Sequence, residues 1–359
     1  MPTLIIHPEK PLAPEELDQF LPSGYRPAGQ SIYATDYLRT EEDDGVYGCI
    51  QLRLPLRDFH FKKRHRRLMS KHANYFRTEI GPASLPDAAM YEVNRRYMEV
   101  HPAKSREDIE FHLVSEFTGE RVLNTHCLKV FLKDRLVAFS FFDVGQRTVY
   151  TKAGIYDPAF SDYSLGTYTL LLELEWAVAQ GYNYYHPGYF APEYPVFNYK
   201  LKFGSVEYRD CLTELWHPLP KNDPSTPTDP YRHNEAALLK AQAVFDQQAL
   251  PTTLMEYPSF TARFHYPNSG GRLLDVPFLL QVDQYGTTNQ AMIVVYENST
   301  AEYYCLHPQY SGLRDLKVHP FGPGGYPRYP KPVVIGYVVA AAKSPEELLL
   351  ELPRQNSQD

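Results

Sequence analysis

Cysteine is scarce in this chain, and its four copies are scattered. Cys49, Cys127, Cys211 and Cys305 form no C-x-x-C pair and have no histidines at ligand spacing beside them. This pattern argues against a disulfide framework and against a zinc or iron–sulfur site that is evident from sequence. We therefore expect no bound metal and no cofactor.

Long apolar runs are also missing. No stretch approaches the roughly 18–20 continuous apolar residues that a membrane helix needs. Met1–Lys10 lacks the basic start and apolar run of a signal peptide. We therefore expect a cytoplasmic protein with no membrane partner. With 359 residues, of which 43% are apolar and 22% charged, the chain has the composition of a globular protein of about two domains.

Five prolines gather in residues 218–230, among aspartate, serine and threonine. A helix does not survive that density of proline, so the stretch is typical of a linker. We place one domain at residues 1–217, the linker at 218–233 and a C-terminal α+β module at 234–359. No sequence motif indicates what this module does.

The first domain alternates strand and helix patterns, which favours a mixed α/β sheet. The pattern predicts strands at 46–56, 147–156, 182–189 and 206–216, a hairpin at 128–144, and helices at 87–100, 105–117 and 164–180. Asp87 and Ser105 would cap the first two helices, and Ser164 or Asp162 the third. In the module, a helix at 234–248 and strands at 273–282, 291–296 and 332–341 are expected.

A basic segment stands out, because the net charge of the chain is −7. Residues 57–77 hold eight lysines and arginines against one acid, Asp58. Such a segment steers a polyanion to one face of an acidic protein. The ordinary interpretation, a solvated helix start, stays open. The candidate nucleic-acid contacts are Lys62, Lys63, Arg64, Arg66 and Arg67.

Two further segments have the residues of a binding site. Ser164, Leu165, Gly166 and Thr167 open the long helix, where free N–H groups attract an anion or an oxyanion. Residues 182–200 hold six tyrosines broken by prolines and a glycine, and rings on a rigid loop offer stacking faces to a base. Each also has a plain structural interpretation, as a helix cap and as an aromatic corner. Ionisable side chains near these segments are candidates by position alone: Asp143, Lys152, His186, Glu193 and Lys200.

Five segments, in order along the chain, together resemble the arginyl-tRNA–protein transferase family. Leu56–Arg67 is similar to that family's basic segment, and Met90–His101 to its tyrosine- and histidine-containing helix. Tyr163–Ala177 resembles its S-L-G-T-Y helix. Tyr184–Pro192 is similar to its glycine-containing aromatic strand, and Asn198–Lys200 to its terminal Y-K. The resemblance covers about residues 22–217. Two features depart from the family pattern: residues 24–33 contain no cysteine, and the family's C-P-K-M appears as residues 194–197, Tyr-Pro-Val-Phe.

The resemblance implies a mixed-sheet, GNAT-like acyltransferase fold and transfer of arginine or leucine from aminoacyl-tRNA to a protein N-terminus. Ser164–Thr167 and Tyr189 would then bind the 3′ end of the tRNA or the reaction's oxyanion. Tyr199, Lys200 and Glu193 would serve catalysis or hold the acceptor, and the basic segment would bind tRNA phosphates. Two alternatives remain: an acyl-CoA-dependent N-acyltransferase, and a non-catalytic relative that acts as a binding scaffold.

Overall fold

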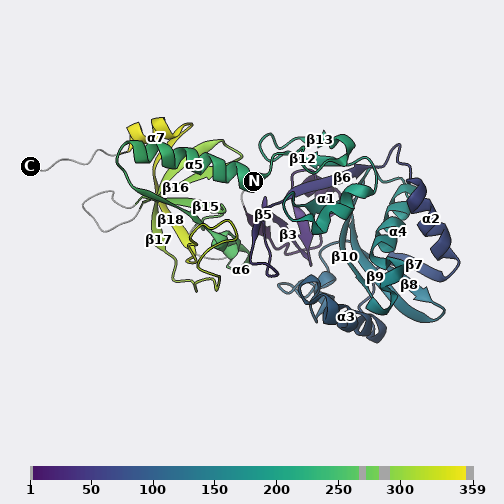
Figure 1. Cartoon of the computed structure of the whole chain (residues 1–359). Helices are drawn as coiled ribbons and strands as arrows, with labels where there is room; N and C mark the ends of the chain where they lie inside the picture. Colours follow the sequence, from purple (N-terminus) through teal and green to yellow (C-terminus); the bar gives the residue numbers. More distant parts are fainter. Residues whose placement is uncertain (1–2, 267–271, 283–291, 353–359) are drawn as a thin grey trace, which may run out of the picture.

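A computed structural model describes residues 3–266, 272–282 and 292–352. Two β-sheets organise the chain, as Figure 1 shows. The larger sheet has eight strands in the order β13-β12-β6-β11-β10-β9-β8-β7. Its strands are β6 (Ile50–Pro55), β7 (Phe76–Pro82), β8 (Thr125–Leu132), β9 (Arg135–Val144), β10 (Thr148–Tyr156), β11 (Tyr184–Phe190), β12 (Glu207–Arg209) and β13 (Trp216–Pro218). Every neighbouring pair is antiparallel except β10 and β11, which run parallel.

Helices cover both faces of this sheet, which accounts for the near-continuous burial of β9. α4 (Leu165–Ala179) packs on one face through apolar residues such as Leu171 and Leu174, and α2 (Lys63–Ala73) lies beside it. α3 (Ala88–Val100) covers the other face, where Met90 and Val93 meet phenylalanines of β9. Asp87 caps α3 by accepting a hydrogen bond from the Met90 N–H at 2.9 Å. The predicted mixed α/β sheet is therefore confirmed.

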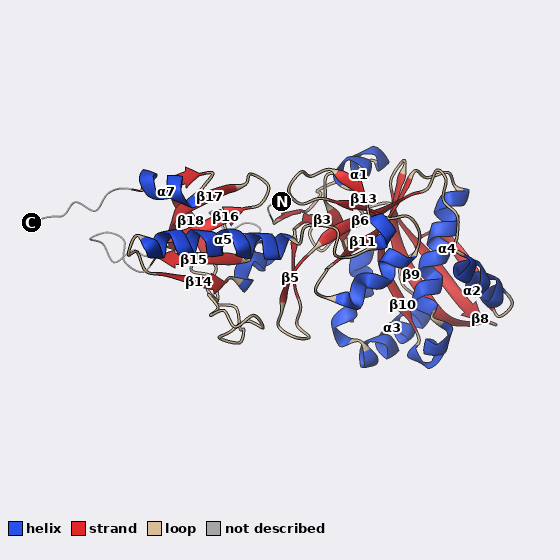
Figure 2. Ribbon diagram, turned by 45° about the horizontal axis from the view of Figure 1, so that its top comes forward, coloured by secondary structure: helices blue, strands red, loops and turns tan. Residues whose placement is uncertain are grey.

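The smaller sheet is a five-stranded antiparallel meander, and Figure 2 shows it with helices along one side. Its strands are β14 (Thr252–Glu256), β15 (Phe278–Val282), β16 (Met292–Glu297), β17 (Glu302–Tyr310) and β18 (Val333–Ala342), and its helices are α5 (Pro230–Gln247), α6 (Ala262–His265) and α7 (Pro345–Glu351). The expected α+β character of this part is confirmed. The sequence patterns missed β14, β17, α6 and α7. Ala291, the first residue of one predicted strand, lies outside the described residues.

Short elements of the N-terminal segment connect the two sheets. They are β1 (Leu4–Ile6), α1 (Pro14–Phe20), β2 (Arg26–Ala28), β3 (Ser31–Ala34), β4 (Tyr37–Arg39) and β5 (Val46–Gly48). Tyr37 and Val46 are buried in the core of the C-terminal part, beside Phe260 and Leu280. The division of the chain at residues 218–233 stays a proposal, and α5 already begins within that range, at Pro230.

Three predicted elements differ in the structure. Residues 105–117 form only a 3-10 turn at Ile109–His112, because Ser105 donates its hydroxyl to Asn94 instead of capping a helix. The strand predicted at 206–216 is a hairpin, β12 and β13, closed by a turn in which the Asp210 carboxylate accepts from the Thr213 N–H. The strand predicted at 46–56 is divided into two. β5 pairs with β4 in a separate two-stranded sheet, and β6 joins the larger sheet.

Candidate active site

A cavity of about 920 Å³ opens where the parallel strands β10 and β11 diverge. The two strands pair only from Thr148–Tyr150 to Tyr184–His186. Beyond that point β11, which bulges between Tyr185 and Gly188, stays paired with β6 alone, while β10 continues along β9. The gap between them is lined by Thr151–Gly154 of β10 and Pro187–Tyr189 of β11. This divergence is the feature that creates the site.

The start of α4 forms one wall of the cavity, through Ser164, Leu165, Gly166 and Thr167. Ser164 has a left-handed backbone conformation, with φ of 52°, and its side chain makes no capping hydrogen bond. Ser164 thus stands at the predicted N-cap position of α4, but its side chain does not cap the helix. Helix geometry leaves the N–H groups at this end free to meet an anion, and no acid stands in the first turn of α4.

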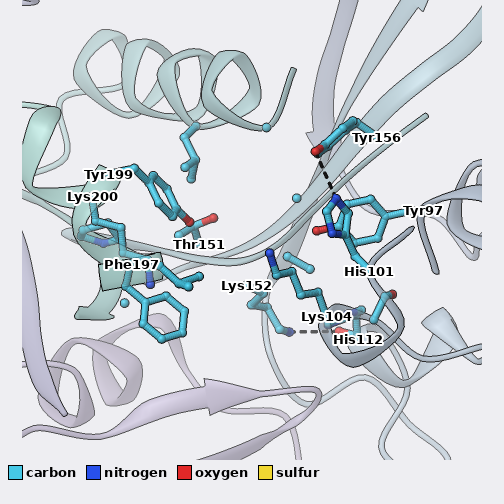
Figure 3. A pocket seen from close by; sticks show the side chains of 18 of the residues that line it. Tyr97, His101, Lys104, His112, Thr151, Lys152, Tyr156, Phe197, Tyr199 and Lys200 are labelled. Atoms are coloured by element: carbon cyan, nitrogen blue, oxygen red, sulfur yellow. Dashed lines mark hydrogen bonds between the residues drawn. The ribbon is translucent and has the colours of Figure 1, made fainter. Parts of the chain in front are cut away.

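The opposite wall comes from the end of β11 and the 3-10 helix Pro195–Lys202, which follows it. It carries Tyr189, Phe197, Tyr199 and Lys200, and Figure 3 shows the last three on the side of the cavity facing α4. The structure thus places the Ser164–Thr167 segment and Tyr189, Tyr199 and Lys200 around one cavity.

Lys200 is buried, with 9% of its surface exposed. Its ammonium group donates a hydrogen bond to the Tyr189 carbonyl at 2.8 Å and lies 4.9 Å and 4.8 Å from the ring centres of Tyr189 and Phe197. Burial, and then the positive charge of Arg26, lower the pKa of Lys200 to about 7. A large share of Lys200 is therefore neutral at physiological pH and able to accept a proton.

Gly188 allows this lysine to approach the strand. Its φ is +88°, and a Cβ built there would stand 3.2 Å from the Lys200 ammonium nitrogen. A side chain at this position would be strained and would displace the amine.

A third wall was missed by the sequence patterns. It consists of Tyr97 and His101 at the end of α3, with Lys104 and Arg106 in the turn after it. The Tyr156 hydroxyl faces the His101 ring at 3.4 Å, as Figure 3 shows. His101 belongs to a segment of the family resemblance, which was the only available signal. Lys104 and Arg106 had none, because their position depends on how residues 101–117 fold back.

A buried ion pair lies beneath the cavity. Lys152 of β10 donates to the Asp143 carboxylate and to the His112 carbonyl, each at 3.0 Å, and to the Thr125 hydroxyl at 3.2 Å. Both charged side chains are at most 2% exposed. Because these contacts occupy Lys152, its role is to hold β9, β10 and the loop at His112 together beneath the cavity.

Two groups of candidates lie outside the cavity lining. Glu193 forms a surface ion pair with Arg232 of α5, with a shortest N···O distance of 2.6 Å. Glu193 does not line the cavity. The basic segment forms the exposed start of α2, apart from the lining, and Arg64 donates to the Lys202 carbonyl at 3.0 Å. In the described part of the chain, none of Lys62, Lys63, Arg66 and Arg67 forms an ion pair.

Metal chemistry finds no support in the described residues. All four cysteines are buried free thiols. The described ranges contain no group of three or more histidine, cysteine, aspartate or glutamate side chains arranged to hold a metal. Within the same ranges, no helix is long and apolar enough to cross a membrane.

The lining as a whole suits an anionic, aromatic ligand. Among the described residues it includes six tyrosines (Tyr33, Tyr97, Tyr150, Tyr156, Tyr189 and Tyr199) and four lysines or arginines (Lys104, Arg106, Lys152 and Lys200), but no aspartate or glutamate. Tyrosine faces stack on bases, and a cation such as Lys104 offsets phosphate charge. Of the others, Lys152 is paired with Asp143 and Arg106 with Glu116, the latter at 2.8 Å. The fold and the cavity together define the site: a mixed sheet whose strands diverge beside a helix start.

Comparison with known proteins identifies the family that this chain resembles. Residues 89–210 match the sequence model of "Arginine-tRNA-protein transferase, C terminus". An "Aspartate/glutamate leucyltransferase" of Campylobacter jejuni is 26% identical over 172 residues, which is 47% of this chain and 71% of that protein. A protein of the same name from Vibrio cholerae is 26% identical over 210 residues, which is 56% of this chain and 83% of that protein. The predicted resemblance to aminoacyl-tRNA–protein transferases is confirmed.

Two solved structures also show partial similarity. FemX is 11% identical in sequence, with a TM-score of 0.31 over 53% of this chain and 63% of that chain. L-PGS from Bacillus licheniformis is 13% identical, with a TM-score of 0.30 over 49% of this chain and 50% of that chain. This chain thus spans about half to two thirds of those proteins.

Proposed function

We propose that this protein transfers an amino acid, arginine or leucine, from charged tRNA to the N-terminal α-amine of a protein. The observation that carries the proposal is the cavity, in which the start of α4 faces the aromatic wall of Tyr189, Phe197 and Tyr199 across a lining without carboxylates. The confirmed family resemblance names the same chemistry. We expect the reaction to take place in the cytoplasm and to change the N-terminal signal that governs degradation of the acceptor.

The 3′ end of the tRNA would occupy the cavity. The terminal adenosine stacks on the tyrosine faces, and Lys104 at the third wall offsets its phosphates. The exposed start of α2 holds phosphates further along the tRNA, through Arg64, Arg66 and Arg67. The N–H groups of Leu165 and Gly166 point at the ester carbonyl, where negative charge develops.

The reaction is aminolysis of an ester. The acceptor's α-amine, whose pKa is roughly 7.7–8.0 when free, attacks the ester carbonyl, and the new N–C bond forms a tetrahedral oxyanion. Neutral Lys200 accepts the proton that the nitrogen loses. The C–O bond to the ribose then breaks, and the ribose oxygen leaves with that proton as a hydroxyl. A base with a pKa near the working pH suits this proton transfer.

The test is a transfer assay with labelled arginyl-tRNA and leucyl-tRNA. Each is offered with peptides that begin with aspartate, glutamate, lysine or arginine. We expect the label of one tRNA to appear in at least one peptide, and none to appear when the α-amine is acetylated. Transfer from acyl-CoA in place of tRNA would establish the acyltransferase alternative. Binding of charged tRNA without transfer would establish the scaffold alternative.

A further inference from the structure

His72 is a buried side chain of α2 that the proposed mechanism does not use. Only 1% of its surface is exposed. Its Nε2 lies 2.6 Å from the main-chain carbonyl oxygen of Tyr163. Because a carbonyl oxygen only accepts hydrogen bonds, Nε2 is the donor. Nδ1 is also buried and has no hydrogen-bond partner among the described residues. The polar contact of this ring is therefore with the backbone just before α4 begins.

Three aromatic rings fix the position of the His72 imidazole. The ring centres of Tyr168, Phe76 and Tyr163 lie 4.9, 5.5 and 5.8 Å from that of His72. Tyr163 and Tyr168 stand on either side of the start of α4, and α2 lies beside this helix in Figure 1. A ring enclosed in this way has little freedom to turn, so packing sets the direction of its N–H group.

The carbonyl that His72 contacts belongs to the peptide group that joins Tyr163 to Ser164. Ser164 has φ of 52°, a left-handed conformation that is unfavourable for a residue with a side chain. Such a conformation persists only where surrounding contacts hold it, and the Ser164 side chain makes no capping hydrogen bond. A donor that fixes the Tyr163 carbonyl restricts rotation of the peptide group. It therefore helps to hold the Ser164 backbone.

The backbone of Ser164 decides which N–H groups of α4 are free. Its carbonyl accepts hydrogen bonds from the N–H groups of Thr167 and Tyr168, each at 3.0 Å. The preceding residues, Leu165 and Gly166, line the cavity. Their N–H groups are the two donors that the proposed function assigns to the ester carbonyl. A shift of the Ser164 backbone would therefore move these donors, although no residue of α2 lines the cavity.

We propose that His72 is a positioning residue for amino-acid transfer, which holds the Tyr163 carbonyl and, through Ser164, orients the two free N–H groups at the start of α4. The inference rests on the proposed function, because that function supplies the oxyanion for these groups to bind. It also gives α2 a second task. The start of this helix carries the candidate tRNA contacts, and its end supports the reacting centre.

Methionine and glutamine at position 72 test the proposal in the full chain. His72→Met fills a similar volume but donates no hydrogen bond, whereas the amide nitrogen of His72→Gln stands as many bonds from the backbone as Nε2 and still donates. At saturating charged tRNA and peptide, we expect His72→Met to lower kcat about 100-fold, the effect of a displacement of about 1 Å. The tRNA affinity and the KM for the peptide should stay unchanged. His72→Gln should recover about 10-fold of the loss, the effect of one restored hydrogen bond.

Two further variants make the comparison specific. His126→Met is the matched control, because His126 packs on Trp176 near the other end of α4, with ring centres 5.5 Å apart, and it should transfer at the wild-type rate. Glycine adopts a left-handed conformation without strain, so in a Ser164→Gly background His72→Met should lower kcat by only about 10-fold. If His72→Met does not fold, His72→Asn takes its place, since its amide nitrogen stops one bond short of the carbonyl.

Several results would overturn the proposal. One is an unchanged kcat in the folded variant that lacks the donor. Another is an equal loss in His72→Met and His72→Gln, because packing and not the hydrogen bond would then matter. A third is a loss confined to tRNA affinity, since His72 would then act only through the start of α2. The same loss with and without Ser164→Gly would exclude the route through Ser164.

Hydrogen exchange separates this inference from the proposed function, because it needs no substrate. The amides of Thr167 and Tyr168 should exchange about 10-fold faster in His72→Met than in wild type, as the start of α4 opens more often. Unchanged exchange would overturn the inference about His72. Absence of transfer by the wild type, with exchange altered as expected, would overturn the proposed function alone.

Discussion

Replacing Lys200 by methionine removes a buried amine and keeps an unbranched chain of similar length. In the folded protein the pKa of Lys200 is lowered to about 7, whereas in an unfolded chain it is roughly 10.4. Between these values the unfolded chain binds a proton that the folded protein does not. The free energy of unfolding therefore rises with pH in this window, by up to about 1.4 kcal/mol per pH unit. Below pH 7 both states bind the proton, and the burial cost is present in full.

Urea unfolding between about pH 7 and 8.5 measures this contribution. We expect the free energy of unfolding of wild type to gain about 1–2 kcal/mol relative to Lys200→Met across that interval. Lys202→Met is the control, because Lys202 lies exposed in the same 3-10 helix and should follow wild type. Parallel curves for wild type and Lys200→Met would refute the reasoning, since Lys200 would then carry an ordinary pKa.

The same residue has a catalytic test. Lys200→Arg replaces a largely neutral amine by a permanently charged guanidinium, which supplies no base near neutral pH. We expect it to lower kcat by about 10²–10⁴-fold, the usual contribution of a positioned base, with tRNA affinity unchanged. Full activity in Lys200→Arg would show that the proton leaves by another route.

Three further results are expected. Changing Arg64, Arg66 and Arg67 to alanine should weaken tRNA binding. It should also reduce the slope of log affinity against log salt by about two to three units, because each phosphate contact contributes about 0.9. If a binding titration at several salt concentrations gives an unchanged slope, the start of α2 is not part of the tRNA interface. Gly166→Val should lower transfer by about 100-fold, because the substrate can no longer approach the backbone closely. The melting temperature should change little, because a Cβ there stands 3.5 Å from Tyr156 and meets no clash. Unimpaired transfer would exclude contact between the substrate and the helix start. Elemental analysis of the purified protein should find no stoichiometric zinc or iron, and one metal per chain would contradict the account.

The parts of the fold that follow from sequence are those set by local chemistry. Asp87 at the start of α3 predicted its helix, since capping acts within one turn. Local rules failed where a side chain had a distant partner. Ser105 bonds to Asn94 instead of starting a helix, and the strand predicted at 46–56 is divided because its first part pairs with β4.

The candidate site was predictable where two signals coincided. The glycine in the start of α4 and the tyrosines after β11 belong to consecutive elements of one strand–helix–strand unit, whose ends converge on one side of a sheet. Lys104 could not be found in this way, because it stands in no motif and reaches the cavity through long-range packing. Glu193 was misplaced for the same reason, since its partner Arg232 is 39 positions away.

The central claim is that the chain forms a peptide bond between an amino acid carried by tRNA and a protein N-terminus. Mass spectrometry of an acceptor peptide, incubated with the full chain and charged tRNA, tests it most directly. The account predicts a peptide heavier by one leucine or arginine residue, with fragment ions that place the addition at the N-terminus. Gly166→Val should form this product about 100-fold more slowly. A peptide of unchanged mass with every charged tRNA, or an addition at a lysine side chain, would contradict it.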